Sequence, residues 1–452
     1  MRALRIVVPV LGEGLALADR LRALRPLRER GAELVVVDGG STDETWAVAC
    51  AHADQVLSAP RGRASQMNAG AWASGNAGAR APGCPDLLLF LHADTQLPAD
   101  ADRLIDAALA AGRAWGRFDV RIAGAHPMLR VVERMMNLRS RLTGMATGDQ
   151  ALFMTREVFE QLGGYADLPL MEDLELSRRL RRVSAPVCIR TPVVTSGRRW
   201  EKHGIWRTIA LMWRLRAAWF FGAKPQVLAD RYGYSRRPDP APAGVAILAK
   251  APVAGLAKTR LIPALGARGA ARLQRQFSLQ TLHTAQASGL GPVTVWCAPD
   301  AGHRFFRALA RVRGTHCATQ PDGDLGTRMQ HACERHFHDH PGLPVLLVGT
   351  DCAVLTPGHL QAAARALLLH DAVMIPAEDG GYVLLGLRRP LPQVFEGIAW
   401  STPQVLTQTR DRLRSAGARW TELEPLWDVD ETADWQRLQR LRATIETGED
   451  PP

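Results

Sequence analysis

Several acidic side chains stand directly after apolar runs that are long enough to be buried strands. Asp38 follows "AELVVV", Asp94 closes "DLLLFLHAD" and Asp351 closes "LPVLLVGTD". In open α/β sheets, ligands bind beyond the carboxyl ends of the strands. Carboxylates there could hold a divalent cation such as Mg²⁺, which prefers oxygen ligands. An Asp that caps the next helix is the plain alternative, but three such positions favour a ligand site.

The first half of the chain adds groups that suit a nucleoside diphosphate. Glu13 and Asp43 also follow predicted strand ends, and "APRGRASQMNAGA" contains Arg61, Gln66 and Asn68 near two glycines. Glycine lets backbone N–H groups approach an anion, and arginine supplies positive charge. Further along, Glu172 and Asp173 begin a helical stretch, where they could serve the site or interact with the helix dipole.

The second half repeats the combination of a basic loop and strand-end acids. "AILAKAPVAGLAKTRL" places Lys258 and Arg260 after its first predicted strand, but without the G-x-x-x-x-G-K-[ST] spacing of a P-loop. Asp351 and Asp430 are candidate ligands of one divalent ion, and Asp379 precedes a double glycine. An anion-binding site is therefore expected here too.

Alternating strand and helix signals surround both sets of residues. "LRIVVPV" and "GVAILAKAP" open the two halves, and helices and further strands follow in the same order. This alternation predicts βαβ units with mainly parallel central sheets. "YSRRPDPAPAG" has three prolines and no hydrophobic period, which predicts a linker. We expect an α/β protein with domains at 1–233 and 244–452 and a linker at 234–243.

Composition argues against a nucleic-acid-binding or membrane-spanning protein. Basic residues outnumber acidic ones by 56 to 45, but no basic run carries interleaved aromatics, so nucleic acid is not an expected partner. The scattered cysteines, without a C-x-x-C pair, predict reduced thiols in the cytosol. "GIWRTIALMWRLRAAWFFGAKP" predicts an amphipathic helix that packs on its own domain or lies on a membrane surface. We expect a cytoplasmic location with at most peripheral contact with the inner face of the membrane; the oligomeric state is left open.

The first half, taken as a whole, resembles family 2 glycosyltransferases of the GT-A fold. The resemblance rests on "VVPVLGE", "VVVDGGSTDET", "LHADT", "GDQALFMTREVFEQLGGY", "MEDLELSRRL" and "RRW". "GRASQMNAGA" and "LHADT" are most similar to a subgroup linked to arsenosugar biosynthesis. The resemblance implies a nucleotide-diphospho-sugar transferase domain that moves a sugar from an NDP-sugar to an acceptor hydroxyl with inversion.

By that resemblance, Asp38 contacts the nucleotide base, Asp94 anchors Mg²⁺ or Mn²⁺ on the diphosphate, and Asp173, beside Glu172, is the general base. The other matched residues are assigned to nucleotide-sugar binding: Pro9, Glu13, Asp43, Arg61, Gln66, Asn68, His92, Arg199 and Trp200. Two departures matter. His92 stands where the family has an acid, so it could bind phosphate or ribose, ligate a metal, or support packing. Ser196 replaces the Gln of processive members, which favours a single transfer.

The second half resembles the glycosyltransferase-like family tied to the same arsenosugar context and, more distantly, phospholactate guanylyltransferase. The resemblance rests on "KAPVAGLAKTRL", "DLGTRM", "GTDCAVLTP", "AEDGGYVLLGL", "AWST" and "DVDE". It implies that Lys258 and Arg260 bind a nucleotide's phosphates, and that Asp351 and Asp430 hold the divalent metal. Asp379 and Tyr382 join the nucleotide-sugar site by the same resemblance.

The leading hypothesis is a bifunctional glycosyltransferase made of two tandem GT-A (Rossmann-like) domains. The first transfers a sugar, and the second binds a nucleotide or NDP-sugar and catalyses a second glycosyl or nucleotidyl transfer. Two alternatives stay open: the main activity is nucleotidyl transfer by the second domain, or one domain is a non-catalytic binding or scaffold module. The expected partners are an NDP-sugar, a small-molecule or lipid-linked acceptor, and Mg²⁺ or Mn²⁺.

Overall fold

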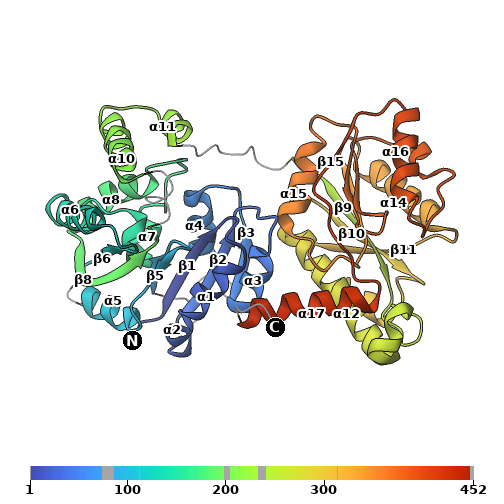
Figure 1. Ribbon diagram of the computed structural model, residues 1–452, viewed down its shortest axis with the longest axis horizontal. Coiled ribbons are helices and arrows are strands. Elements are labelled where there is room, and N and C mark those ends of the chain that lie inside the picture. Colours follow the sequence, from blue (N-terminus) through green and yellow to red (C-terminus); the bar gives the residue numbers. More distant parts are fainter. Residues whose placement is uncertain are drawn as a thin grey trace. The chain divides into compact units, whose positions relative to one another are not determined.

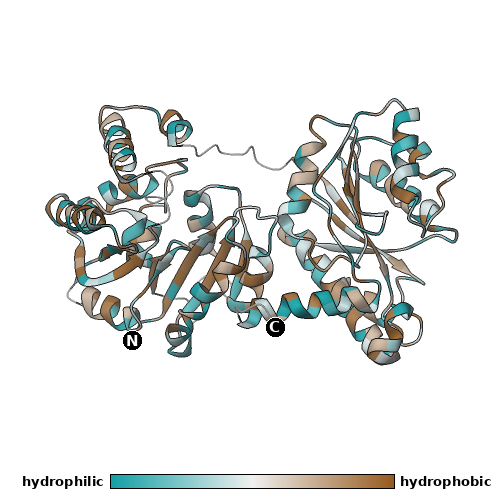
Figure 2. Cartoon of the chain, in the orientation of Figure 1, coloured by the Kyte–Doolittle hydropathy of each residue, from teal (hydrophilic) through white to brown (hydrophobic). Residues whose placement is uncertain are grey.

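The structure is a computed structural model that describes residues 2–73, 86–110, 112–197, 204–232, 241–312 and 314–447. The chain divides into two compact units, Met1–Pro238 and Asp239–Ile445. Each unit is described by itself (Figure 1). Figure 2 shows that the hydrophobic residues of each unit are concentrated in its central strands.

The described residues of the first unit form an eight-stranded sheet in the order β3-β2-β1-β4-β7-β6-β8-β5. β3, β2, β1 and β4 are parallel, whereas β7 runs antiparallel to both β4 and β6. β6 and β8 are parallel, and β5 is antiparallel to β8. The strands are β1 (Leu4–Val10), β2 (Glu33–Asp38), β3 (Gln55–Ser58), β4 (Leu87–Phe90), β5 (Thr95–Gln96), β6 (Trp115–Ile122), β7 (Phe153–Thr155) and β8 (Val187–Thr195).

Helices connect and cover these strands. All seven residues of β1 are buried, as expected for a parallel strand covered on both faces. The helical stretch "LALADRLRALRPLRERG" after β1 forms two short helices instead of one, because Pro26, the second residue of the second helix, has no N–H group to continue the first. The helices are α1 (Leu17–Arg22), α2 (Arg25–Glu29), α3 (Thr45–His52), α4 (Arg63–Trp72), α5 (Ala101–Ala110), α6 (Pro127–Thr143), α7 (Arg156–Gln161), α8 (Glu172–Val183), α10 (Ile205–Phe220) and α11 (Pro225–Tyr232).

The second unit follows the same plan with a seven-stranded sheet among its described residues, in the order β11-β10-β9-β12-β14-β13-β15. β11, β10, β9 and β12 are parallel, and β14 is antiparallel to β12 and β13. Its strands are β9 (Gly244–Lys250), β10 (Val293–Ala298), β11 (Thr315–Thr319), β12 (Val345–Val348), β13 (Ala372–Pro376), β14 (Tyr382–Leu387) and β15 (Trp420–Glu422). Its helices are α12 (Ile262–Ala287), α13 (Arg304–Leu309), α14 (Leu325–Asp339), α15 (Pro357–Ala366), α16 (Val405–Ser415) and α17 (Thr432–Thr447). The predicted α/β fold class with mainly parallel central sheets is confirmed.

α4 packs tightly against the sheet of the first unit. Gly70 makes this possible, because a Cβ there would come within 2.4 Å of Val7 Cγ1. Buried Arg5 donates from Nη1 to three carbonyl oxygens at the C-terminal end of α4, and its Nε pairs with Glu33 at 2.8 Å. Positive charge at a helix C-terminus is favourable. These contacts fix the helix that begins with Arg63.

α10 packs on its own unit and also presents bulky apolar side chains to solvent. Leu215 and Thr208 are buried, whereas the side chains of Trp206, Trp213 and Phe220 are exposed. No helix in the described part of the chain is both long and apolar enough to cross a membrane.

Candidate active site

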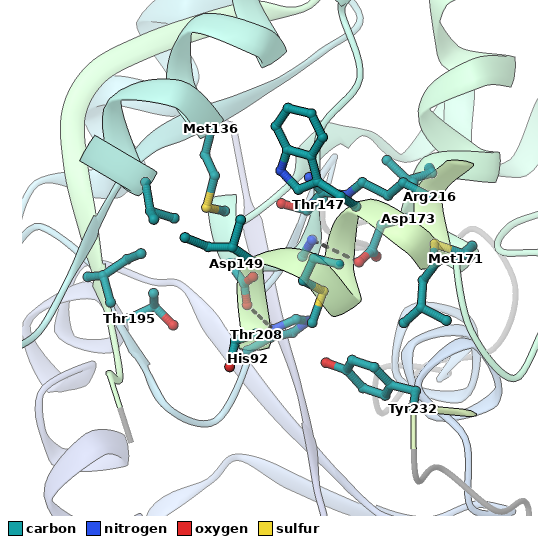
Figure 3. A pocket seen from close by; sticks show the side chains of 18 of the residues that line it. His92, Met136, Thr147, Asp149, Met171, Asp173, Thr195, Thr208, Arg216 and Tyr232 are labelled. Carbon is teal, nitrogen blue, oxygen red and sulfur yellow. Dashed lines mark hydrogen bonds and ion pairs between the residues drawn. The ribbon is translucent and has the colours of Figure 1, made fainter. Parts of the chain in front are cut away.

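A cavity of about 1250 Å³ lies in the first unit, beyond the carboxyl ends of β1 and β4. One part of its lining is polar and comes from loops and from the start of α4 and α8. The other part is apolar and comes from α6 and α10 (Figure 3). The polar part includes Glu13, Arg63, His92, Asp94, Asp149, Glu172 and Asp173.

The loop after β4 is tied to the loop after β1. Arg20 donates from Nη1 to the carbonyl oxygen of Ala93 and to Glu13 Oε2, both at 2.9 Å. This clamp holds Asp94 at the wall of the cavity, where its Oδ1 accepts a weak hydrogen bond from Thr95 at 3.4 Å. Asp94 therefore offers one nearly unencumbered carboxylate to a ligand.

His92 has a specific partner that the sequence did not identify. Its Nδ1 lies 3.3 Å from Asp149 Oδ1, and its Nε2 is buried without a hydrogen-bond partner. The Asp149 side chain remains 46% exposed, facing the cavity. Burial by itself would raise the pKa of Asp149. The hydrogen bond and charge of His92 and the charges of Arg63 and Arg216 have the larger effect, so the pKa of Asp149 is lowered.

Asp173 is the best-placed proton acceptor in the cavity. It is 8% exposed, its Oδ2 accepts from the Gly148 N–H at 2.8 Å, and its Oδ1 is buried without a partner. Burial raises the pKa of the Asp173 carboxyl. Figure 3 shows the bond to Gly148 and the contact between His92 and Asp149 as dashed lines.

The backbone is strained just before α8, whose first two residues are Glu172 and Asp173. Met171, just before the helix, has φ 70° and ψ 16°, a left-handed conformation that is uncommon for a residue with a side chain. Glu172 and Asp173 are both buried and line the cavity. A role as exposed partners of the helix dipole alone would not require that burial.

Several residues predicted to bind the nucleotide make internal hydrogen bonds. Asp38 is fully buried and accepts from the backbone N–H groups of Gly40 and Ser41 at 3.2 and 3.0 Å. Gln66 Nε2 donates to the carbonyl oxygens of Val10 and Val37 at 2.9 and 2.8 Å. These bonds join the carboxyl ends of β1 and β2. Gln66 therefore stabilises the two strand ends beside the site.

The remaining predicted residues of the first unit differ in their placement. Asn68 exchanges two hydrogen bonds with the backbone of Tyr165, at 2.8 and 2.9 Å. Asp43 Oδ1 accepts from the Thr45 N–H at 3.2 Å. Pro9 is buried within β1, and Arg61 is half-buried before α4. Arg199 and Trp200 lie outside the described residues.

In the second unit, the basic loop and the strand-end acids meet. Lys258 Nζ lies 2.7 Å from Asp351 Oδ1 and 2.8 Å from Asp430 Oδ1, and its side chain is only 6% exposed. The ammonium therefore stands between the two carboxylates that were expected to share a divalent ion. Arg260 Nη1 is 3.9 Å from Asp430 Oδ2 and is mostly exposed.

Two further predicted residues of the second unit have other partners. Asp379 is exposed and accepts from the Gly381 N–H at 2.9 Å. The Tyr382 hydroxyl contacts Met329 Sδ of α14 at 3.8 Å. Burial raises the pKa of nearby Asp428 to about 6, and the negative charges of Asp379 and Asp430 add to this effect. Several carboxylates therefore act on one another at this end of the sheet.

Comparison with protein families identifies two segments. Residues 5–162 match the model of "Glycosyl transferase family 2". Residues 281–402 match "Uncharacterized protein conserved in bacteria (DUF2064)". The predicted family 2 domain is therefore confirmed, and the two largely parallel sheets agree with the predicted fold class. The search of the curated proteins gave no match.

Solved structures resemble parts of the chain. A candidate nucleotide-diphospho-sugar transferase from Desulfovibrio desulfuricans G20 is 31% identical over 45% of this chain and 88% of its own, with a TM-score of 0.42. TarS residues 1–349 from S. aureus, in complex with UDP-GlcNAc, is 14% identical over 43% of this chain and 58% of its own, with a TM-score of 0.34. A CMP:2-keto-3-deoxy-manno-octonic acid synthetase with CTP is 13% identical over 45% and 99%, with a TM-score of 0.32.

Glu172 should make stability depend on pH. Burial, followed by the Asp173 charge, raises the pKa of Glu172 from its ordinary 4.5 to about 7. A raised pKa means that the folded state loses stability as pH rises through that range, because ionisation is harder in the folded protein. Glu172→Gln stays neutral, so we expect it to lose less thermal stability than the wild type between about pH 5 and about pH 8. Exposed Glu157→Gln on α7 is the control, and equal pH profiles for all three proteins would contradict the assignment.

Proposed function

Because the first unit contains a family 2 glycosyl transferase domain, we propose that it transfers a sugar from an NDP-sugar to an acceptor hydroxyl. The observation that supports this proposal is the hydrogen bonding of the two Asp173 carboxylate oxygens. Its Oδ2 is fixed by the Gly148 N–H, and its buried Oδ1 has no partner. A buried carboxylate oxygen with no partner is costly, and an acceptor hydroxyl in the cavity would satisfy it.

The proposed transfer is a single displacement. The acceptor oxygen forms a bond with the anomeric carbon while the bond from that carbon to the diphosphate breaks. The nucleoside diphosphate leaves with the bonding electron pair, and the hydroxyl proton passes to Asp173 Oδ1. Attack opposite the leaving group inverts the anomeric carbon. General-base catalysis of this kind contributes roughly 10²–10⁴-fold.

Charge in the cavity supports binding of the diphosphate. Arg63 begins α4, so its guanidinium and the positive end of the helix dipole act together on an anion. Asp94 would hold Mg²⁺ or Mn²⁺. The described residues contain no cluster of three or more acids, His or Cys suited to a metal, which fits an ion that takes its other ligands from the diphosphate and water. When bound, such an ion stabilises charge on the leaving group.

Asp173→Asn should abolish most sugar transfer and spare nucleotide binding. We expect turnover to fall by about 10²–10⁴-fold, because the amide cannot take the acceptor's proton. Release of nucleoside diphosphate from a panel of NDP-sugars with Mg²⁺ measures turnover, and calorimetry with UDP and GDP measures binding. Asp19→Asn, whose side chain is 75% exposed on α1, is the matched control. Wild-type turnover in Asp173→Asn would rule out this base.

We also propose that the second unit binds a nucleotide and transfers a glycosyl or nucleotidyl group, which would make the protein bifunctional. The supporting observation is Lys258, held buried between Asp351 and Asp430 at the carboxyl end of the sheet. A phosphate would attract this ammonium and free both carboxylates for a divalent ion. The alternatives are that nucleotidyl transfer is the main activity, or that the unit only binds or scaffolds. The arsenosugar context and the cytoplasmic location stay predictions.

Nucleotidyl transfer can be tested separately from sugar transfer. The full-length protein with an NTP, a sugar 1-phosphate and Mg²⁺ should release diphosphate. We expect Asp351→Asn to reduce this release at least about tenfold, while NDP-sugar turnover by the first unit stays unchanged. Exposed Asp411→Asn on α16 is the control. No diphosphate release by the wild type, together with nucleotide binding, would leave the second unit as a binding module.

A further inference from the structure

Two arginines of the cavity have no role in the transfer described above. Arg139 lies on α6 and Arg216 on α10, and both line the cavity. The Nε and Nη2 atoms of Arg139 are buried without a hydrogen-bond partner. Arg117, beneath α6, is also buried but donates to Ser140 Oγ at 3.0 Å and to Asp119. The guanidinium of Arg139 therefore has two buried nitrogens without a partner, unlike that of Arg117.

Arg216 acts on Arg139, and both arginines are attracted to the same acid. Burial, followed by the charge of Arg216, lowers the pKa of Arg139 to about 10, so Arg139 remains cationic at neutral pH. Asp149 is the carboxylate whose charge acts on both, but its Oδ1 already pairs with His92. An unpaired buried charge is expensive. A second anion in the cavity would relieve that cost.

Each arginine ends an apolar stripe on its helix. The spacing along both stripes is that of one helix face. On α6 the stripe is Met128, Val131, Val132, Met135, Met136 and Arg139. On α10 it is Trp206, Ile209, Met212, Trp213 and Arg216. Met136 and Ile209 pack against the same small core beside β6. The two helices thus form an apolar wall with positive charge at one end.

This wall is only partly covered by protein. Met135 is 51% exposed, Trp206 69% and Trp213 63%. Large apolar side chains gathered at a cavity mark a surface that gains stability when a ligand removes it from water. Arginine recognises phosphate and carboxylate oxygens with paired N–H donors. The wall and its arginines therefore suit one molecule that has both an anionic group and an apolar chain.

We propose that the acceptor of the first unit is a lipid-like anion that also carries the attacking hydroxyl, with its phosphate or carboxylate at Arg139 and Arg216 and its aliphatic chain between α6 and α10. This inference rests on the proposed sugar transfer and specifies the class of its acceptor. The same cavity contains Asp173, as Figure 3 shows together with Arg216 and Met136. The chain and anion thereby hold the acceptor in the compartment that contains the base.

The test uses the full-length protein and three probes in calorimetry: octyl phosphate, 1-octanol and inorganic phosphate. These carry the chain with the anion, the chain alone and the anion alone. We expect octyl phosphate to bind at least about tenfold more tightly than either other probe, since each part adds binding energy. Arg139→Met and Arg216→Met should each weaken octyl phosphate about tenfold and leave 1-octanol unchanged. Arg139→Lys should recover part of the loss, which a folding defect would not allow.

Exposed Arg134→Met on α6 is the matched control and should bind octyl phosphate as the wild type does. Equal binding of octyl phosphate by Arg139→Met, Arg216→Met and the wild type would overturn the proposal. So would octyl phosphate binding no tighter than inorganic phosphate. Release of nucleoside diphosphate from NDP-sugars by the wild type reports on the proposed transfer separately. If the nucleoside diphosphate is released but the three probes bind equally well, only the inference about the acceptor is wrong. If no NDP-sugar is turned over, the proposed sugar transfer itself is wrong.

Discussion

The close packing around Gly148 is the constraint on which the candidate site depends. A Cβ at this position would lie 2.1 Å from His92 Nε2 and 2.8 Å from Asp173 Oδ2. The absence of a side chain lets the Gly148 N–H reach Asp173 at 2.8 Å while the His92 ring stays beside it. One glycine thus brings the end of β4 and the start of α8 together, and it decides which oxygen of Asp173 is left for a substrate.

Much of the fold could be predicted because its signals are local. Apolar runs with a polar end, such as the one that stops at Asp94, mark parallel strands and their carboxyl ends. Proline and glycine mark the breaks between elements. The split of one expected helix before Pro26 shows the limit, since a proline without an N–H group ended the continuous helical pattern. The antiparallel direction of β7 and β14 depends on tertiary packing, and no local sequence pattern indicated it.

The candidate site was only partly predictable for the same reason. Asp94, Glu172 and Asp173 could be named because they stand at strand and helix ends. Asp149 could not be assigned, because its partner His92 is 57 positions away. Arg139 looks like any surface arginine of an amphipathic helix until the fold buries its Nε and Nη2 atoms. Gln66, expected at the nucleotide, joins two strands instead of leaving its amide for a ligand, and Lys258 shows that two acids at a sheet edge can enclose an ammonium.

The most direct measurement is the turnover of NDP-sugars by Gly148→Ala, alone and combined with His92→Ala, with thermal stability recorded for each protein. Because the added methyl collides with His92 and Asp173, Gly148→Ala should cost about 1–3 kcal/mol of stability and displace the base. Release of nucleoside diphosphate should then fall at least about tenfold, or about 1.4 kcal/mol. Removing the His92 ring should restore part of the stability lost by Gly148→Ala. Wild-type turnover and stability in Gly148→Ala would contradict the account.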